Sequence, residues 1–310
     1  MHAEHVPVLA DEVIRALNIQ PAGSYLDGTY GRGGHSELIL SQLNEQGRLL
    51  VIDRDPAAIA AAKLRHGKDP RVLIEHGVFA DVGQLAAKHN MHGGIAGCLL
   101  DLGVSSPQLD QASRGFSFSK DGDLDMRMNP EEGLSAAEWL QSVDERELAS
   151  VLRRFGEERQ ATRIARAIVQ AGAEKPLKTT TELADAVLSV VRPRPGKIHP
   201  ATKTFQAIRI ATNDELNQVS MALDALLDVL QVGGRMVILA FQSLEDRIVK
   251  RFIRTHSEVS APYRGLPDIP AEHQPRMQPI GKLIRSSEKQ IQANPRARSV
   301  RMRVAEKVRP

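Results

Sequence analysis

A turn between a β-rich run and a helical run reads Asp27–Gly28–Thr29–Tyr30–Gly31–Arg32–Gly33–Gly34–His35. Glycines at such a turn permit a left-handed backbone and let a ligand approach the chain closely, and the helix that follows offers unpaired N–H groups. Asp53 ends the next β-rich run, where an acid can accept both hydroxyls of a ribose. A tight structural turn explains the glycines alone, but together with Asp53 they predict a site for an adenosine-containing cofactor.

The spacing of these glycines separates two classes of cofactor. A dinucleotide site needs the pattern G-x-G-x-x-G, which this turn lacks. The glycines instead fall four, six and seven residues after Asp27, which resembles the D-x-G-x-G-x-G loop of class I methyltransferases with Thr29 in place of the first glycine. We therefore expect S-adenosylmethionine. A nicotinamide-dependent dehydrogenase, which shares the fold class, is the alternative.

On both sides of this turn, short β-rich runs alternate with helical runs, as is typical of an α/β protein with a parallel sheet. A fifth strand, Arg235–Phe241, follows the fourth only after a long interval, so we expect an insertion at residues 110–212 and a sheet domain at 1–109 and 213–310. The other expected elements of the sheet domain are strands Ser24–Asp27, Arg48–Asp53, Val72–Glu75 and Ile95–Asp101, and helices Ser36–Leu43 and Pro56–Leu64.

The insertion is expected to be a small all-helical domain. A capping box formed by Thr212 and Glu215 is expected to start the helix that leads back to the sheet, and Gly233–Gly234 to end that segment. The helices expected in the insertion are Ala136–Gln141, Glu145–Phe155, Glu158–Ala171 and Thr181–Val191.

A second candidate site follows Asp101, at the carboxyl end of the fourth strand, where open α/β sheets place substrate chemistry. Ser105–Ser106–Pro107–Gln108 resembles a worn form of the (Asn/Asp/Ser)-Pro-Pro-aromatic motif of methyltransferases that act on the amino groups of bases. A serine hydroxyl and a backbone carbonyl there would orient an exocyclic amine toward the methyl group. The alternative is a proline turn after a buried strand. Where the motif has a stacking aromatic, this chain has Gln108, and Phe116 or Phe118 would either replace that ring or belong to the core.

The distribution of charge and the cysteine content indicate which class of partner the protein binds and in which compartment it works. The net charge is only +3, yet residues 281–310 hold nine Lys/Arg against two Glu, and residues 192–209 hold five and no acid. Such blocks favour a polyanionic partner, with plain solvated surface as the alternative. The single cysteine, Cys98, excludes an internal disulfide and indicates a reducing, cytoplasmic setting. No apolar run is long enough to span a membrane.

No metal site is expected. The ten histidines form no HExxH or similar cluster. Among the N-terminal residues, His2, Glu4 and His5 fit a frayed terminus better than a ligand set. Asp121, Asp123 and Asp125 alternate like the start of a calcium loop, but its glycine and closing glutamate are missing, which favours a polar turn.

With these motifs in place, the chain closely resembles the bacterial 16S rRNA (cytosine-N4)-methyltransferase family, also called RsmH or MraW. The resemblance runs in order along nearly the whole chain. Its matching stretches are HVPVL (5–9), DGTYGRGGHS (27–36), IDRDP (52–56), LLDLGVSSPQLD (99–110), RGFSF (114–118), LDMRM (124–128), SAAEWL (135–140), GEER (156–159), RIARAIV (163–169), HPATKTFQAIRI (199–210), SLEDRIVKRF (243–252) and NPRARS (294–299).

The resemblance implies a class I methyltransferase (Rossmann-like) fold with an inserted helical domain for substrate recognition. It also implies direct transfer of a methyl group from S-adenosylmethionine to N4 of one cytidine in the decoding centre of 16S rRNA, within the small ribosomal subunit. A homodimer is also compatible with the resemblance. Carried over by motif position, the cofactor contacts are Gly33, Gly34, His35, Asp53, Phe79, Asp101 and Gln108, while Ser105 and Ser106 are the residues expected to orient the amine.

One departure from the family pattern concerns the residue before Ser243. The pattern expected there is Phe-His-Ser, whereas this chain has Phe241–Gln242–Ser243. A histidine acting as an essential base at that position is therefore not expected here. Two further alternatives stay open: an amino-methyltransferase that acts on DNA or on another RNA, and a ribosome-assembly factor without catalysis.

Overall fold

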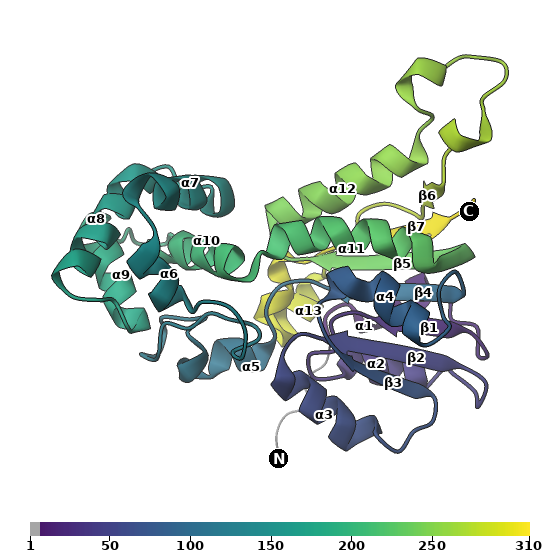
Figure 1. Ribbon diagram of the computed structural model, residues 1–310, viewed down its shortest axis with the longest axis horizontal. Coiled ribbons are helices and arrows are strands. Elements are labelled where there is room, and N and C mark those ends of the chain that lie inside the picture. Colours follow the sequence, from purple (N-terminus) through teal and green to yellow (C-terminus); the bar gives the residue numbers. More distant parts are fainter. Residues whose placement is uncertain (1–6) are drawn as a thin grey trace. The chain divides into compact units, whose positions relative to one another are not determined.

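The computed structural model describes residues 7–310, and the chain divides into two compact units (Figure 1). One unit comprises the described residues up to Gly103 together with Leu216–Pro310, and the other is Val104–Glu215. The insertion expected from sequence, 110–212, lies within the second unit, which begins and ends a few residues further out. The N-terminal residues His2, Glu4 and His5 lie outside the described residues.

The first unit contains a seven-stranded sheet in the order β3-β2-β1-β4-β5-β7-β6. Neighbours among the first five strands pair in parallel, whereas β7 runs antiparallel to both β5 and β6. The strand order reverses between β1 and β4, and open α/β sheets bind ligands at such a point. The strands are β1 (Ser24–Asp27), β2 (Arg48–Asp53), β3 (Val72–His76), β4 (Ile95–Asp101), β5 (Leu230–Ala240), β6 (Met277–Pro279) and β7 (Arg301–Lys307).

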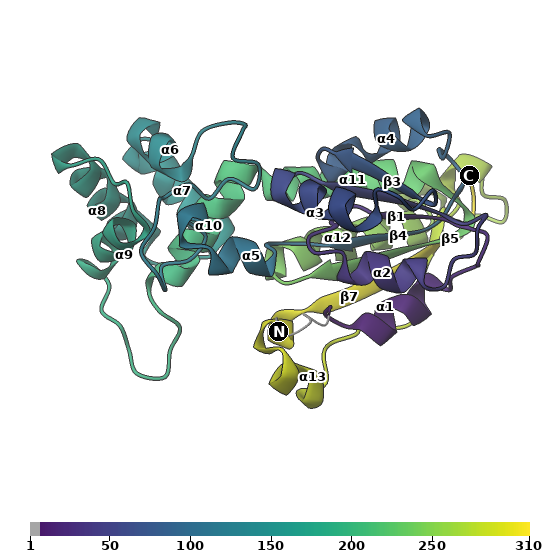
Figure 2. The ribbon, with the colours of Figure 1, turned by 90° about the horizontal axis from the view of Figure 1, so that it is seen from below.

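Helices cover both faces of this sheet (Figures 1 and 2). Alternate strand residues point to opposite faces, so Leu26 and Leu50 join one apolar cluster while Tyr25 and Leu49 join the other. The first cluster also receives side chains from α4 (Val82–Lys88), α11 (Glu215–Val229) and α12 (Ser243–Ser257). The second receives them from α1 (Ala10–Leu17), α2 (Gly34–Leu40) and α3 (Pro56–His66).

The second unit is helical and has its own apolar core, which includes Leu148, Ile164 and Phe205. Three of its helices start with capping boxes, at Ser105, Ser135 and Thr179. Its helices are α5 (Ser106–Asp110), α6 (Ala136–Ser142), α7 (Glu145–Gly156), α8 (Ala161–Glu174), α9 (Thr180–Leu188) and α10 (Ala201–Asn213).

The predicted start of the helix before the fifth strand is wrong. Thr212 lies inside α10, a helix not expected from the sequence, and the chain turns at Asp214, whose φ is 50°. The carboxylate of Glu215 is engaged by the guanidinium of Arg209 through two contacts of 2.7 Å instead of closing a box with Thr212. Gly233–Gly234 does not end the segment either, because β5 continues through both glycines from Leu230 to Ala240.

Two other predictions can be followed in the second unit. Phe116 is buried in its core, and Phe118 packs against His199 and Phe205 with ring centroids 4.5 and 4.9 Å apart. Asp125 pairs with Arg127, and Asp121 accepts a hydrogen bond from the Thr181 backbone. In the part of the chain that the structure describes, no group of His, Cys, Asp or Glu is placed to hold a metal ion, and no helix is both long and apolar enough to cross a membrane.

Candidate active site

Three acidic side chains stand at the carboxyl ends of neighbouring strands. Asp27 ends β1, Asp53 ends β2 and Asp101 ends β4. Asp27 lies opposite Val51 on one side and Leu99 on the other, so Asp53 and Asp101 each extend two residues beyond it. Residues two apart on a strand face the same side. The register therefore brings two predicted cofactor residues together with a third carboxylate, Asp27, that was not among the predicted site residues.

The glycine turn has the conformation that its sequence predicts. Gly31 and Gly33 have φ angles of 55° and 79°, in the left-handed region that favours glycine. A Cβ atom on Gly33 would lie 2.4 Å from the hydroxyl of Tyr30, and one on Gly34 would lie 3.3 Å from the ring of Pro7. Side chains are thus excluded where the backbone of the turn passes its neighbours most closely.

Hydrogen bonds tie this turn to the ends of the strands beside it. The Thr29 hydroxyl lies 2.6 Å from the backbone N–H of Asp101 and accepts a hydrogen bond from it, which links the turn to β4. The buried Asp27 carboxylate accepts from the Ser36 hydroxyl at 2.7 Å and from the Thr29 backbone at 3.1 Å. Thr29, which stands where the D-x-G-x-G-x-G loop of class I methyltransferases has its first glycine, therefore connects two of the three acidic strand ends.

Asp53 has the geometry expected of a group that binds a diol. One carboxylate oxygen accepts from the Gly31 N–H at 2.7 Å and the other from the Asp55 N–H at 2.8 Å. An ionised carboxylate has about four acceptor positions, so one remains on each oxygen. The two backbone bonds fix the carboxylate and leave it able to accept two hydroxyls.

His35 and Asp101 hold polar atoms that lack partners. His35 is 6% exposed, and both of its ring nitrogens are buried without a hydrogen bond. Its Nε2 lies 3.7 Å from Oδ2 of Asp101, too far for a hydrogen bond, and Oδ1 of Asp101 is also buried and unpaired. Buried polar atoms without partners are rare and costly, so this edge of the sheet is built for a polar ligand.

The charge of the site indicates the charge of that ligand. Burial raises the pKa of Asp53 to about 6 and, together with the nearby charges of Asp27 and Glu245, raises that of Asp101 to about 7. Burial also lowers the pKa of His35 to about 4, so its ring is neutral at pH 7. No Lys or Arg within residues 7–310 pairs with any of the three aspartates. A ligand with positive charge would restore their ionised forms.

A fourth acid, Glu245, lies near Asp101 and was not predicted from sequence. Glu245 is 1% exposed and accepts hydrogen bonds from the backbone of Phe241 and Gln242, at 2.9 and 3.1 Å. Gln242, which stands where the family pattern has histidine, is the N-cap residue of α12. The Gln-x-x-Glu spacing at the start of this helix was the sequence signal for the acid.

Phe79 and the motif after β4 complete the predicted residues. Phe79 opens a short 3-10 helix, is half-buried, and packs against the core beside Gly28. Ser105 and Gln108 form the capping box of α5 in the second unit, where the side-chain oxygen Oε1 of Gln108 accepts a hydrogen bond from the Ser105 backbone N–H at 2.9 Å. Ser106 is the first residue of α5. The structure thus groups the first-unit residues and gives Ser105 and Gln108 a role in starting a helix.

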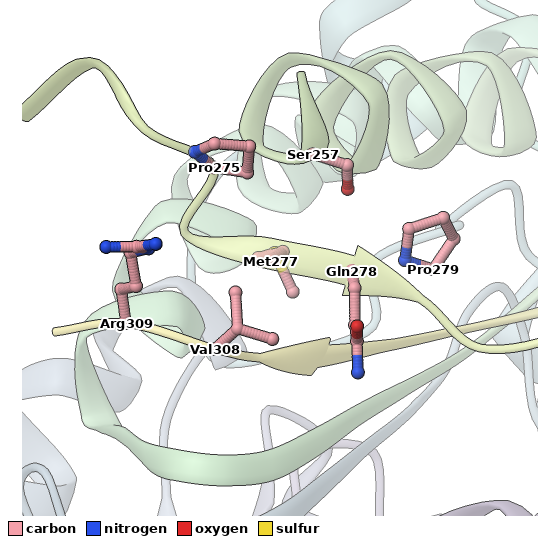
Figure 3. A pocket seen from close by; sticks show the side chains of 7 residues that line it. All are labelled: Ser257, Pro275, Met277, Gln278, Pro279, Val308 and Arg309. Atoms are coloured by element: carbon pink, nitrogen blue, oxygen red, sulfur yellow. The ribbon is translucent and has the colours of Figure 1, made fainter. Parts of the chain in front are cut away.

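A cavity of about 490 Å³ lies elsewhere in the first unit (Figure 3). It is lined by residues near the end of α12 and along β6 and the chain end, among them Ser257, Met277 and Arg309. Met277 lies opposite Lys307, the last residue of β7, whereas Arg301, the first residue of β7, lies opposite Ala240 of β5. The cavity is therefore at the opposite end of β7 from the end of β5. No predicted site residue lines this cavity.

Comparisons with known proteins identify the family. A model of the MraW methylase family matches residues 2–308. Among solved structures, the chain is similar to an rRNA methylase from Streptococcus thermophilus (11% identity, 97% of this chain and 94% of that one, TM-score 0.42). It is also similar to SMU.1697c from Streptococcus mutans, solved in complex with SAH (11% identity, 98% and 99%, TM-score 0.43).

The match to the family model and the sheet order support each other. The expected class I methyltransferase fold is confirmed, with a mixed seven-stranded sheet and helices on both of its faces. The acidic strand ends also fit a cofactor with positive charge. Because the family model spans nearly the whole chain, this protein belongs to the MraW methylase family, and its methyl donor is S-adenosylmethionine.

Proposed function

We propose that this protein methylates the N4 amino group of one cytidine in the decoding centre of 16S rRNA, in the small ribosomal subunit. The observation that carries the proposal is the edge formed by Asp27, Asp53 and Asp101, a site for a cationic cofactor in a chain of the MraW methylase family. The choice of cytidine N4 rests on the resemblance to the (cytosine-N4)-methyltransferase family, and Ser105–Ser106–Pro107–Gln108 also resembles the motif of methyltransferases that act on the amino groups of bases.

In this function, the Asp53 carboxylate accepts hydrogen bonds from the ribose hydroxyls, and the carboxylates of Asp27 and Asp101 balance the positive charge of the cofactor. The backbone of Gly33 and Gly34, beside His35, forms the turn against which the cofactor lies. When bound, S-adenosylmethionine supplies an electrophilic methyl group. Phe79 covers the adenine, and Gln108 is the cofactor contact carried over from the family.

Ser105 and Ser106 are the residues we assign to the substrate amine. The lone pair of an exocyclic amine is delocalised into the ring, so the amine reacts only when it is held in line with the methyl group. A serine oxygen that accepts one of the amine hydrogens provides this orientation. The proton becomes acidic as the new bond forms, so alignment supplies most of the rate.

The test of the function is mass analysis of 16S rRNA from a strain that lacks the gene. We expect one methyl group to be lost from a single cytidine N4 and restored by the wild-type gene. Labelled methyl transfer to small subunits, naked 16S rRNA and DNA then distinguishes the substrates. Small subunits should be the best acceptor, because a helical unit of this size is suited to recognising folded RNA. Unchanged rRNA in the deletion strain, or preferred transfer to DNA, would contradict the proposal.

A further inference from the structure

Residues 281–300, between β6 and β7, form what we call the basic segment. Lys282, Arg285, Lys289 and Arg298 are exposed there, and none of the four forms an ion pair or a hydrogen bond with another residue in the described range 7–310. The only acid in the segment is Glu288. In contrast, many arginines elsewhere in the chain are paired with carboxylates, as Arg303 is with Asp246 at 2.6 Å.

The backbone of the basic segment is fixed, although its charged side chains are exposed. Ile284 and Met302 exchange backbone hydrogen bonds of 3.1 and 2.9 Å. Ala297 and Val300 are 2% and 1% exposed, so the short 3-10 helix Pro295–Ser299 is anchored through Ala297 while the arginine that follows it points outward. Such a segment presents its cations without a large cost of ordering the backbone on binding.

The basic segment lies at the same edge of the sheet as the acidic strand ends. Because β7 is antiparallel to β5, its first residue, Arg301, lies opposite Ala240, the last residue of β5. The residues just before Arg301 therefore lie beyond the carboxyl end of β5. Figure 2 shows the helix of the segment, α13 (Glu288–Ala293), close to α1.

A second connection leads from α13 to the glycine turn. The side-chain amide of Gln290 donates to the carboxylate of Glu12 in the first turn of α1, at 3.2 Å. Pro7 lies against Gly34, the residue where α2 begins. Five residue steps separate Pro7 from Glu12, which an extended chain spans in about 17 Å. The helix α13 is thus connected through the start of α1 to the glycine turn.

We propose that the basic segment is the surface of the first unit on which the phosphate backbone of the substrate RNA docks, beside the reacting nucleotide. This inference rests on the proposed function. The acidic strand ends repel phosphate, so a polyanion that brings a base to this edge needs cations next to them. Exposed Lys and Arg without partners gain most from phosphate, because no internal ion pair has to be broken.

The test compares two variants of equal charge. Lys289→Gln with Arg298→Gln removes one lysine and one arginine from the basic segment. Lys68→Gln with Arg309→Gln removes the same pair of residue types from exposed positions elsewhere in the first unit, where neither side chain has an ion-pair partner among residues 7–310. Affinity for unmodified small subunits is measured from about 50 to 200 mM salt. Melting temperature and cofactor affinity should stay at the wild-type values in both variants.

The first variant should bind roughly tenfold more weakly and lose about 1.5 from the slope of log affinity against log salt, as expected for two lost phosphate contacts. The control should stay near the wild type. Equal slopes of log affinity against log salt in the two variants would overturn the proposal. It would also be overturned if the wild-type protein bound anionic lipid vesicles but showed no salt-dependent affinity for small subunits. Binding is read separately from methyl transfer, so a wild type that binds subunits through this segment without methylating them would refute the proposed function alone.

Discussion

The acidic strand ends and the first turn of α5 both hold predicted site residues, but they use their polar atoms differently. At the strand ends, His35 and Asp101 keep buried atoms without partners, and Asp53 keeps acceptor positions on both oxygens. In α5, the side chain of Gln108 caps its own helix through the backbone of Ser105. Unused hydrogen-bonding capacity in a buried place indicates a ligand, whereas a satisfied cap indicates a contribution to stability.

Asp53→Ala should produce the largest change and tests the ligand-binding half of this comparison. It removes the acceptor of the ribose hydroxyls and also the partner of the Gly31 N–H. Hydrogen bonds to a charged group are worth about 1.5–3 kcal/mol, so the dissociation constant for S-adenosylmethionine should rise about 10- to 150-fold by calorimetry. Asp121→Ala, at an exposed position in the second unit, is the control. Unchanged affinity in Asp53→Ala would remove Asp53 from the cofactor site.

Ser106→Ala and Ser105→Ala test the other half, and here the two serines should differ. If Ser106 orients the amine, its replacement should lower the single-turnover rate of methyl transfer about 10- to 100-fold, with the melting temperature and cofactor affinity unchanged. Ser105 caps α5, so its replacement should cost about 1 kcal/mol of stability in addition to any loss of rate.

Ser105→Gly is the matched control for the cap, because glycine is tolerated at an N-cap position far better than alanine. Recovery of stability without recovery of rate would assign Ser105 to the reaction as well. Wild-type rates in all three variants would leave the backbone at Pro107 as the group that orients the amine.

The pH dependence of cofactor affinity tests whether the acidic strand ends hold a cation. Ionised carboxylates bind the cofactor, and Asp101 and Asp53 have pKa values of about 7 and about 6 in the free protein. Protonation therefore competes with binding below pH 7, and the dissociation constant should be about tenfold higher at pH 6 than at pH 8. S-adenosylhomocysteine has a neutral sulfur, so its affinity should change less. Equal pH dependence for the two ligands would argue against a charge-matched site at the sulfonium.

The sequence predicted two of the acids at this edge of the sheet but not the other two acids that act on them. Asp53 was predicted because it ends a β-rich run, and Asp101, which ends another, was carried over from the family motif; the ends of parallel strands meet at one edge. Asp27 and Glu245 were missed as members of the site, since only the register and the start of α12 show that their charges reach Asp101. Local pattern also failed at Thr212, because the carboxylate of Glu215 pairs with Arg209, six residues before it, instead of closing a capping box.

For the basic segment, too, the sequence predicted the residues but not where they lie. Its charges were visible in the sequence, which predicted a polyanionic partner for residues 281–310. Their location was not, because it depends on the antiparallel return of β7 beside β5 and on the contact between Gln290 and Glu12. Composition thus predicted the class of partner, and topology determines which cations lie near the cofactor.

Asp101→Asn should produce the smallest change, a gain in stability that separates a ligand-binding acid from a structural one. The pKa of Asp101 is about 7 in the folded protein and 3.8 in the unfolded chain, so the free energy of unfolding of the cofactor-free protein falls as pH rises from about 4 to 7. Asparagine removes the charge of this carboxylate. It should therefore stabilise the free protein at pH 8 by about 1 kcal/mol, and by much less at pH 5, where Asp101 is protonated.

Calorimetric unfolding at both pH values measures this difference, and weaker cofactor binding at pH 8 should accompany the gain in stability. A loss of stability at pH 8 would show that the Asp101 carboxylate supports the fold and would remove it from the group of acids that await a ligand.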